Sequence, residues 1–239
     1  MKKNTFLLLA ILQLIVSSVS AQETTTKSVL IETIKEYQQE VGDYAVPYNG
    51  KEESQYYLNL TNHPYWRSAE FAVGDLWYNH VLYKDVLMRL NMHRDELVVQ
   101  MPGKPFTIVL EKEKFNQARL HGHTLIPSQA GVLKNAPSGH YNLLLHNGFF
   151  PIIKSYAVSL EEKIVDRMLE HSFRMSEKIY VCKEGVCYPI NKKRSLLQLF
   201  PDKKKELETY IKQHKLKFNR KQREESIVQV VNYYETMLK

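Results

Sequence analysis

The chain contains two cysteines, Cys182 and Cys187, and their surroundings predict a structural disulfide bond. Glu184-Gly185 between them suits a two-residue hairpin loop, which places Cys182 opposite Cys187 in a non-hydrogen-bonded pair. The Cα atoms of such a pair lie ~4.5 Å apart, within the range that a disulfide tolerates. Redox catalysis uses a Cys-x-x-Cys arrangement at the start of a helix, and the chain has none.

Two histidines, His121 and His123, are the candidates for metal binding. On a strand their side chains would share one face, and with His140 or His146 as a third ligand they could hold zinc or copper. Gly122 between them fits a loop equally well, and the chain's 9 histidines are scattered. We therefore favour packed or surface histidines, with no metal site and no cofactor.

No motif in the sequence selects a catalytic residue. A Gly-x-Ser-x-Gly elbow and a glycine-rich phosphate loop are both missing. Carboxylates that could form an acid/base pair across a cleft are plentiful, for example Asp75, Asp85, Asp95 and Glu96. Because their spacing selects no pair, we interpret them as solvated turn and strand residues.

A basic segment near the C-terminus is the clearest candidate for binding. Residues 191–225 hold 12 Lys and Arg against 5 Asp and Glu. The residues proposed to contact an anionic surface are Lys203, Lys204, Lys205, Arg220, Lys221 and Arg223. The alternative is a solvated helix face. A nucleic-acid partner is set aside, because the N-terminus predicts export.

The first 21 residues are typical of a signal peptide. Lys2 and Lys3 precede an apolar run, Phe6 to Val16, and small residues end at Ala21. We expect a mature protein that starts near Gln22 and is periplasmic or extracellular, held at the outer membrane only through a partner. Beyond the signal, no apolar run approaches the ~20 residues of a membrane-spanning helix.

The elements expected to position these residues begin with an N-terminal helix and linker over 22–47. An antiparallel β domain over 48–190 follows, because apolar residues then alternate with a period of 2, as in Val86, Met88 and Leu90. Turn pairs such as Asn147-Gly148 separate the runs. The expected fold class is α+β: an antiparallel meander or barrel-like sheet with helices at both ends.

A basic helical arm over 191–239 is expected to pack on this sheet. Capping boxes at Ser195 with Gln198 and at Ser226 with Gln229 predict two helix starts, and Pro201-Asp202 predicts a third. Residues 159–173 are ambiguous, since their apolar spacing is helical while both neighbouring runs are strand-like.

Several stretches resemble a family of exported, β-rich proteins of Bacteroidota for which no activity is known. The similar stretches are 48–52, 74–78, 83–86, 95–98, 193–197, 202–207 and 230–234. The resemblance spans most of the mature chain and implies export, but it carries over no catalytic residue. Cys182 and Cys187 are not part of it.

These observations favour an exported cell-envelope binding or scaffold protein without catalytic activity, whose partner is an envelope protein or an anionic surface. One alternative is a secreted hydrolase or metal-dependent enzyme acting on envelope glycans or peptides through His121, His123 and nearby carboxylates. Another is an anionic-surface binder that acts through the basic arm.

Overall fold

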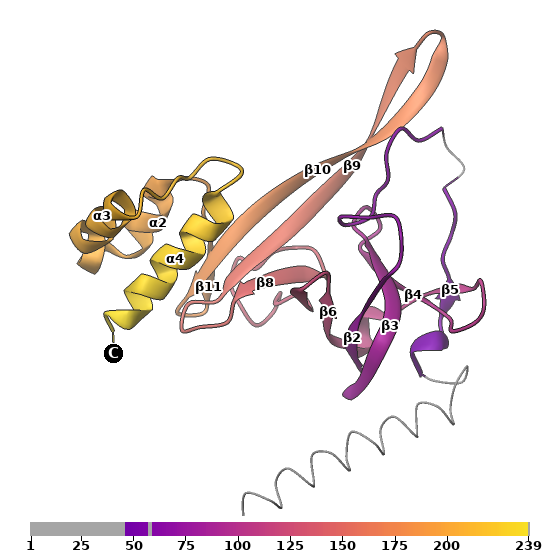
Figure 1. The fold of residues 1–239 in the computed structure, drawn as a ribbon, viewed down its shortest axis with the longest axis horizontal. Coiled ribbons are helices and arrows are strands. Elements are labelled where there is room, and N and C mark those ends of the chain that lie inside the picture. Colours follow the sequence, from indigo (N-terminus) through magenta and orange to yellow (C-terminus); the bar gives the residue numbers. More distant parts are fainter. Residues whose placement is uncertain (1–45, 57–58, 239) are drawn as a thin grey trace, which may run out of the picture. The chain divides into compact units, whose positions relative to one another are not determined.

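The computed structural model describes residues 46–56 and 59–238. The signal peptide predicted over 1–21 lies outside the described residues, as does nearly all of the helix and linker predicted over 22–47. The chain that is described is mainly a β-sheet with three short α-helices near its C-terminus (Figure 1).

Eleven antiparallel strands form one sheet in the order β1-β5-β4-β3-β2-β6-β7-β8-β9-β10-β11. The strands are β1 (Lys51–Glu52), β2 (Ala72–Tyr78), β3 (Val81–Asn91), β4 (Glu96–Gln100), β5 (Thr107–Val109), β6 (Phe115–Leu120), β7 (His123–Ile126), β8 (Asn142–His146), β9 (Ile152–Val165), β10 (Met168–Lys183) and β11 (Val186–Pro189). The expected α+β class and the meander are confirmed. The sheet is open, with β1 and β11 as its outer strands, so the barrel alternative is not what forms.

The helices follow the sheet in the sequence. They are α2 (Lys193–Leu199), α3 (Lys204–Gln213) and α4 (Arg223–Thr236), and short 3₁₀ turns occur at η2 (Val46–Tyr48), η3 (Lys112–Lys114) and η4 (Pro201–Lys203). Two predicted starts are misplaced. Ser195 is the third residue of α2, where its hydroxyl accepts a hydrogen bond from the Lys192 N–H. Ser226 lies inside α4, buried, with its hydroxyl donating to the carbonyl of Lys217.

The ambiguous residues 159–173 form a long β-hairpin, not a helix. Strands β9 and β10 pair without a register shift from Val165–Met168 to Ile152–Val181. Asp166 and Arg167 make the turn with φ angles of 49° and 66°, the left-handed conformation that a two-residue hairpin loop requires. The helical spacing arose because apolar residues flank this turn on both strands.

The three helices pack against the base of this hairpin. Ile152 of β9 and Ile179 and Val181 of β10 are buried with apolar residues from all three helices. Phe200 and Tyr234 meet at the centre of this core, with ring centroids 4.1 Å apart. Figure 1 shows the helices beside the hairpin base, at the opposite end from its tip. The helical arm is therefore held in place by the sheet.

A segment before β2 connects the hairpin to the first half of the sheet. The His171 N–H of β10 donates to the carbonyl of Asn59, and the Trp66 N–H donates to the carbonyl of Leu90 in β3. Trp66 is 3% exposed, and its indole N–H donates to the Tyr156 hydroxyl of β9 at 3.3 Å. These contacts fix the hairpin against the strands around β3.

Candidate functional site

A surface hollow of about 520 Å³ lies between α2 and α3, in the helical arm. Half of its lining residues are cationic. The lining consists of Lys193, Arg194, Leu197, Gln198, Lys204 and Glu208. Leu197 is 4% exposed and belongs to the core below. The hollow therefore combines an apolar floor with three positive side chains and one negative side chain.

The three cations of the hollow come from the first turns of α2 and α3. Lys193, Arg194 and Lys204 are exposed, and within the described part of the chain none of them forms an ion pair or a side-chain hydrogen bond. Their charges repel one another, and Glu208 can offset only part of this repulsion. An anion that enters the hollow would relieve the repulsion and could receive charge-assisted hydrogen bonds.

The short connection between α2 and α3 holds these cations close together. Pro201 cannot continue α2, so the chain turns through η4 and begins α3 at Lys204. Phe200 before the turn and Leu207 after it are both fully buried, which fixes the two helices relative to each other. Lys183 of β10 adds a hydrogen bond from its ammonium group to the carbonyl of Leu199 at 3.4 Å.

The six basic residues proposed for surface contact have different surroundings. Lys204 lines the hollow, and Lys205, Arg220 and Lys221 are exposed without an ion pair to any described residue. Lys203 lies 3.8 Å from a carboxylate oxygen of Glu206. Arg223 is only partly exposed and pairs with Glu177 at 3.5 Å, so its charge is neutralised within the protein.

Arg223 belongs to a charged junction between the hairpin and α4, which no sequence motif indicates. Lys154 of β9 lies 2.8 Å from Glu177 of β10 and 2.7 Å from Glu224 of α4. Burial lowers the pKa of Lys154, but the two carboxylates outweigh it and raise that pKa above its ordinary value. Because its groups bind each other, the junction is structural.

The two candidate metal ligands lie at a hairpin turn. His121 and Gly122 form the turn between β6 and β7, and His123 begins β7. The Trp66 ring lies 5.5 Å from the His121 ring and 5.6 Å from the His123 ring, between centroids. Burial and the Arg67 guanidinium lower the pKa of both histidines, and Arg67 is hydrogen-bonded to His123.

The proposed third ligands do not join these histidines. His140 is packed beside Tyr141, and His146 pairs with Glu235 of α4 at 3.1 Å. Over residues 46–56 and 59–238, no group of three or more His, Cys, Asp or Glu side chains could hold a metal ion. The structure thus gathers aromatic and cationic groups around His121 and His123.

The candidate carboxylates have different surroundings. Asp95, in the turn between β3 and β4, accepts hydrogen bonds from the Lys112 ammonium group and from two backbone N–H groups, those of His140 and Tyr141. Burial raises the pKa of Asp95, but these bonds outweigh it and lower the pKa below its usual value. Asp85 is exposed, and Asp75 and Glu96 are half-buried on other strands. Asp95 therefore stabilises a loop.

A buried carboxylate that sequence reasoning missed is Glu53. It is 4% exposed, lies 2.6 Å from the Arg89 guanidinium and accepts a hydrogen bond from the Tyr65 hydroxyl at 2.8 Å. The Arg89 guanidinium also stacks over the rings of Tyr65 and Phe71. Because every charge in this cluster is paired, it holds the segment before β2 on the sheet.

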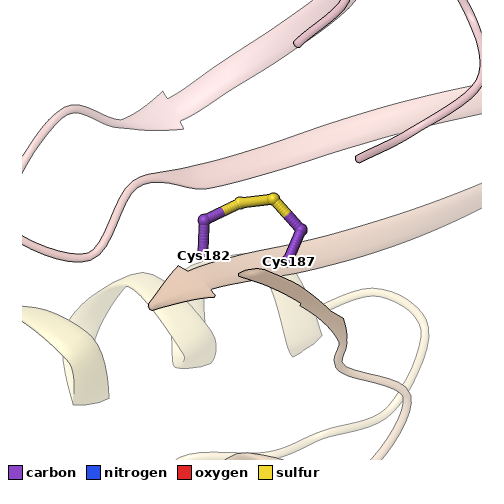
Figure 2. The surroundings of a disulfide bond; sticks show 2 residues. All are labelled: Cys182 and Cys187. Atoms are coloured by element: carbon purple, nitrogen blue, oxygen red, sulfur yellow. A yellow bond between two sulfur atoms is a disulfide. The ribbon is translucent and has the colours of Figure 1, made fainter. Parts of the chain in front are cut away.

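The predicted disulfide is present between Cys182 and Cys187, at the end of the β10–β11 hairpin (Figure 2). The two residues are directly paired, with Cα atoms 4.0 Å apart. Both are buried and pack with Ile153 and Leu133. The N–H of Cys187 donates to the carbonyl of Lys134, so the loop between β7 and β8 lies along the outer edge of β11.

No family model, curated protein or solved structure matches the chain. The similarity to exported proteins of Bacteroidota therefore stays a prediction from the sequence. Among the described residues, no helix is long and apolar enough to cross a membrane.

Proposed function

We propose that this protein is an exported binding protein of the cell envelope, without catalytic activity, whose helical arm binds an anionic surface. The observation that carries this proposal is the hollow between α2 and α3, where the side chains of Lys193, Arg194 and Lys204 form no ion pair or hydrogen bond with any described residue. The signal-like N-terminus supports export, and a buried disulfide is compatible with an oxidising compartment.

The chemistry of the hollow favours a phosphate group carried on a lipid surface. Arginine offers a planar pair of donors that matches phosphate oxygens, and lysines add compact charges beside it. Lys205, Arg220 and Lys221, exposed outside the hollow, add long-range attraction to such a surface. The proposal thus assigns the specific contact to the hollow and a weaker, salt-dependent contribution to its surroundings.

The experiment compares two variants that lose the same charge. One carries Lys193→Gln, Arg194→Gln and Lys204→Gln in the hollow. The matched control carries Lys205→Gln, Lys212→Gln and Lys215→Gln, three exposed lysines of the same arm that do not line the hollow. Binding is measured by co-sedimentation with vesicles of phosphatidylglycerol and phosphatidylcholine, and with phosphatidylcholine alone, in ~0.1 M salt.

Each basic residue near an anionic membrane contributes about 1 kcal/mol, so the hollow variant should bind about a hundredfold more weakly. The control variant should lose about threefold or less, because its charges contribute only screened attraction. Equal losses in both variants would contradict a defined site. Equal binding to phosphatidylcholine alone would refute an anionic ligand altogether.

A further inference from the structure

Beyond its base, the outer edge of β9 in the long β9–β10 hairpin has no described strand beside it. Strand β8 pairs with β9 only at Ile152, Ile153 and Lys154. From Ser155 to Val165, no strand in the described part of the chain pairs with that edge. The other side of the hairpin differs, because the segment at Asn59 covers β10 near His171.

The backbone polarity of this edge follows from the register. The Cys182 N–H of β10 donates toward β9, to the carbonyl of Pro151, whereas the His171 N–H points away from β9. Backbone groups alternate sides along a strand, and the β9–β10 pairing has no shift. The N–H and C=O groups of even-numbered β9 residues therefore point away from β10. The N–H and C=O groups of Val158, Leu160, Glu162 and Ile164 therefore line the open edge.

Such an edge is a template for another strand. Its side chains show which strand would fit, because the sequence Leu160-Glu161-Glu162-Lys163-Ile164 has nearly two-fold chemical symmetry. In an antiparallel pair centred on Glu162, Leu160 of each copy faces Ile164 of the other. Glu161 of each copy likewise faces Lys163 of the other, which is a favourable cross-strand pair.

No neighbouring register offers this match. The register centred on Glu162 places one like-charge pair, Glu162 with its own copy, but forms two opposite-charge pairs. Centring the pair on Glu161 or on Lys163 also places one like-charge pair and forms no opposite-charge pair, so it is less favourable. Centring it on Leu160 leaves Lys163 opposite Ala157 and Glu162 opposite Val158. Ile164 is 74% exposed in the single chain, and the register centred on Glu162 would cover it.

We propose that two copies of this chain dimerise through the open edges of β9, antiparallel and centred on Glu162. The contact is isologous, so it closes as a dimer and does not extend into a fibre. It adds about six backbone hydrogen bonds and joins two hairpins into a four-stranded ribbon. The contact does not involve the hollow between α2 and α3, so dimerisation can be tested independently of anion binding.

The test is a charge swap, followed by sedimentation velocity of the full chain over a range of concentrations. Glu161→Lys and Lys163→Glu each place two like-charge pairs across the contact, and each should raise the dimer dissociation constant by about tenfold or more. The double variant restores opposite charges and should recover most of the wild-type affinity. Lys178→Glu, an exposed site on β10, is the matched control and should dimerise as wild type does.

A substitution at Glu162 gives an independent check, because it should strengthen the dimer where the single charge swaps weaken it. It faces its own copy in the proposed register, so Glu162→Gln removes a repulsion and should tighten the dimer. This variant keeps the backbone pairing of the hairpin and removes only the exposed carboxylate that lies 3.4 Å from the His171 ring nitrogen. A monomeric wild-type chain at all concentrations would overturn the proposal, as would a dimer in which the charge swap fails to restore affinity or Glu162→Gln weakens association.

Discussion

The charged junction at the base of the hairpin gives a quantitative prediction for Lys154→Met. The substitution keeps the aliphatic volume but removes the cation. The Lys154 side chain is 10% exposed and forms ion pairs with both Glu177 and Glu224. Removing one partner of a buried ion pair costs about 3–5 kcal/mol. The cost here should be smaller, about 2 kcal/mol, because Glu177 keeps Arg223 and the Glu224 side chain is 38% exposed to water.

The assay is urea unfolding of the oxidised protein, followed by tryptophan fluorescence, since Trp66 is buried in the fold. Lys178→Met is the matched control, an exposed lysine on β10 that should change the free energy of unfolding by less than about 0.5 kcal/mol. Adding Glu224→Gln to Lys154→Met should recover part of the loss, because it removes the carboxylate left unpaired. Equal losses for Lys154→Met and Lys178→Met would refute the reasoning.

The pH dependence of this effect has a definite sign. The folded-state pKa of Lys154 is raised, so its stabilisation is fully present below the ordinary lysine pKa of about 10.4. It is lost only as pH rises through the folded-state pKa. The difference between wild type and Lys154→Met should therefore stay constant between about pH 7 and pH 10, which unfolding curves at several pH values can check.

Three further predictions concern other parts of the fold. Native protein should show no alkylatable thiol and should have a mass about 2 Da below that of the reduced form. A disulfide that closes a 15-residue loop stabilises by ~3 kcal/mol, and this loop is shorter. Replacing Cys182 and Cys187 with Ser should therefore lower the free energy of unfolding by less than that. Burial and a hydrogen bond to Asp202 raise the pKa of Tyr234 to about 12. Its contribution to the free energy of unfolding should therefore be lost as pH rises from about 10 through 12. In Tyr234→Phe, the free energy of unfolding should decline less over this pH range. A Cβ on Gly74 would lie 2.2 Å from the carbonyl oxygen of Arg119 in β6, a backbone atom, so Gly74→Ala should lower the melting temperature by several degrees. Gly139→Ala, with its nearest contact at 3.9 Å, should not.

The sheet was predictable where one strand face is buried and the other is not. In β3, Val86, Met88 and Leu90 are buried while Leu87 between them is exposed, so the period of 2 is visible in the sequence. The same signal fails at the tip of the β9–β10 hairpin, because residues on both faces are exposed there. The turn at Asp166-Arg167 also lacks glycine, so nothing in its composition indicates a two-residue loop.

Contacts between distant segments explain the remaining differences. Ser226 resembles a helix cap in the sequence, but its hydroxyl bonds to Lys217 from inside α4. The basic run is visible as a count of charges. The sequence does not show that Arg223 pairs with Glu177 while Arg194 has no ion pair among the described residues. That distinction depends on how α2, α3 and α4 pack on the sheet.

The central claim is that the hollow between α2 and α3 receives a phosphate group. The most direct measurement is the change in backbone amide NMR chemical shifts as inorganic phosphate is added to the full chain at constant ionic strength. We predict saturable shifts over Lys193–Gln198 and Lys204–Glu208, and none at Lys212 or Lys215, which lie outside the hollow. Shifts spread over all exposed lysines, or none at all, would contradict the claim.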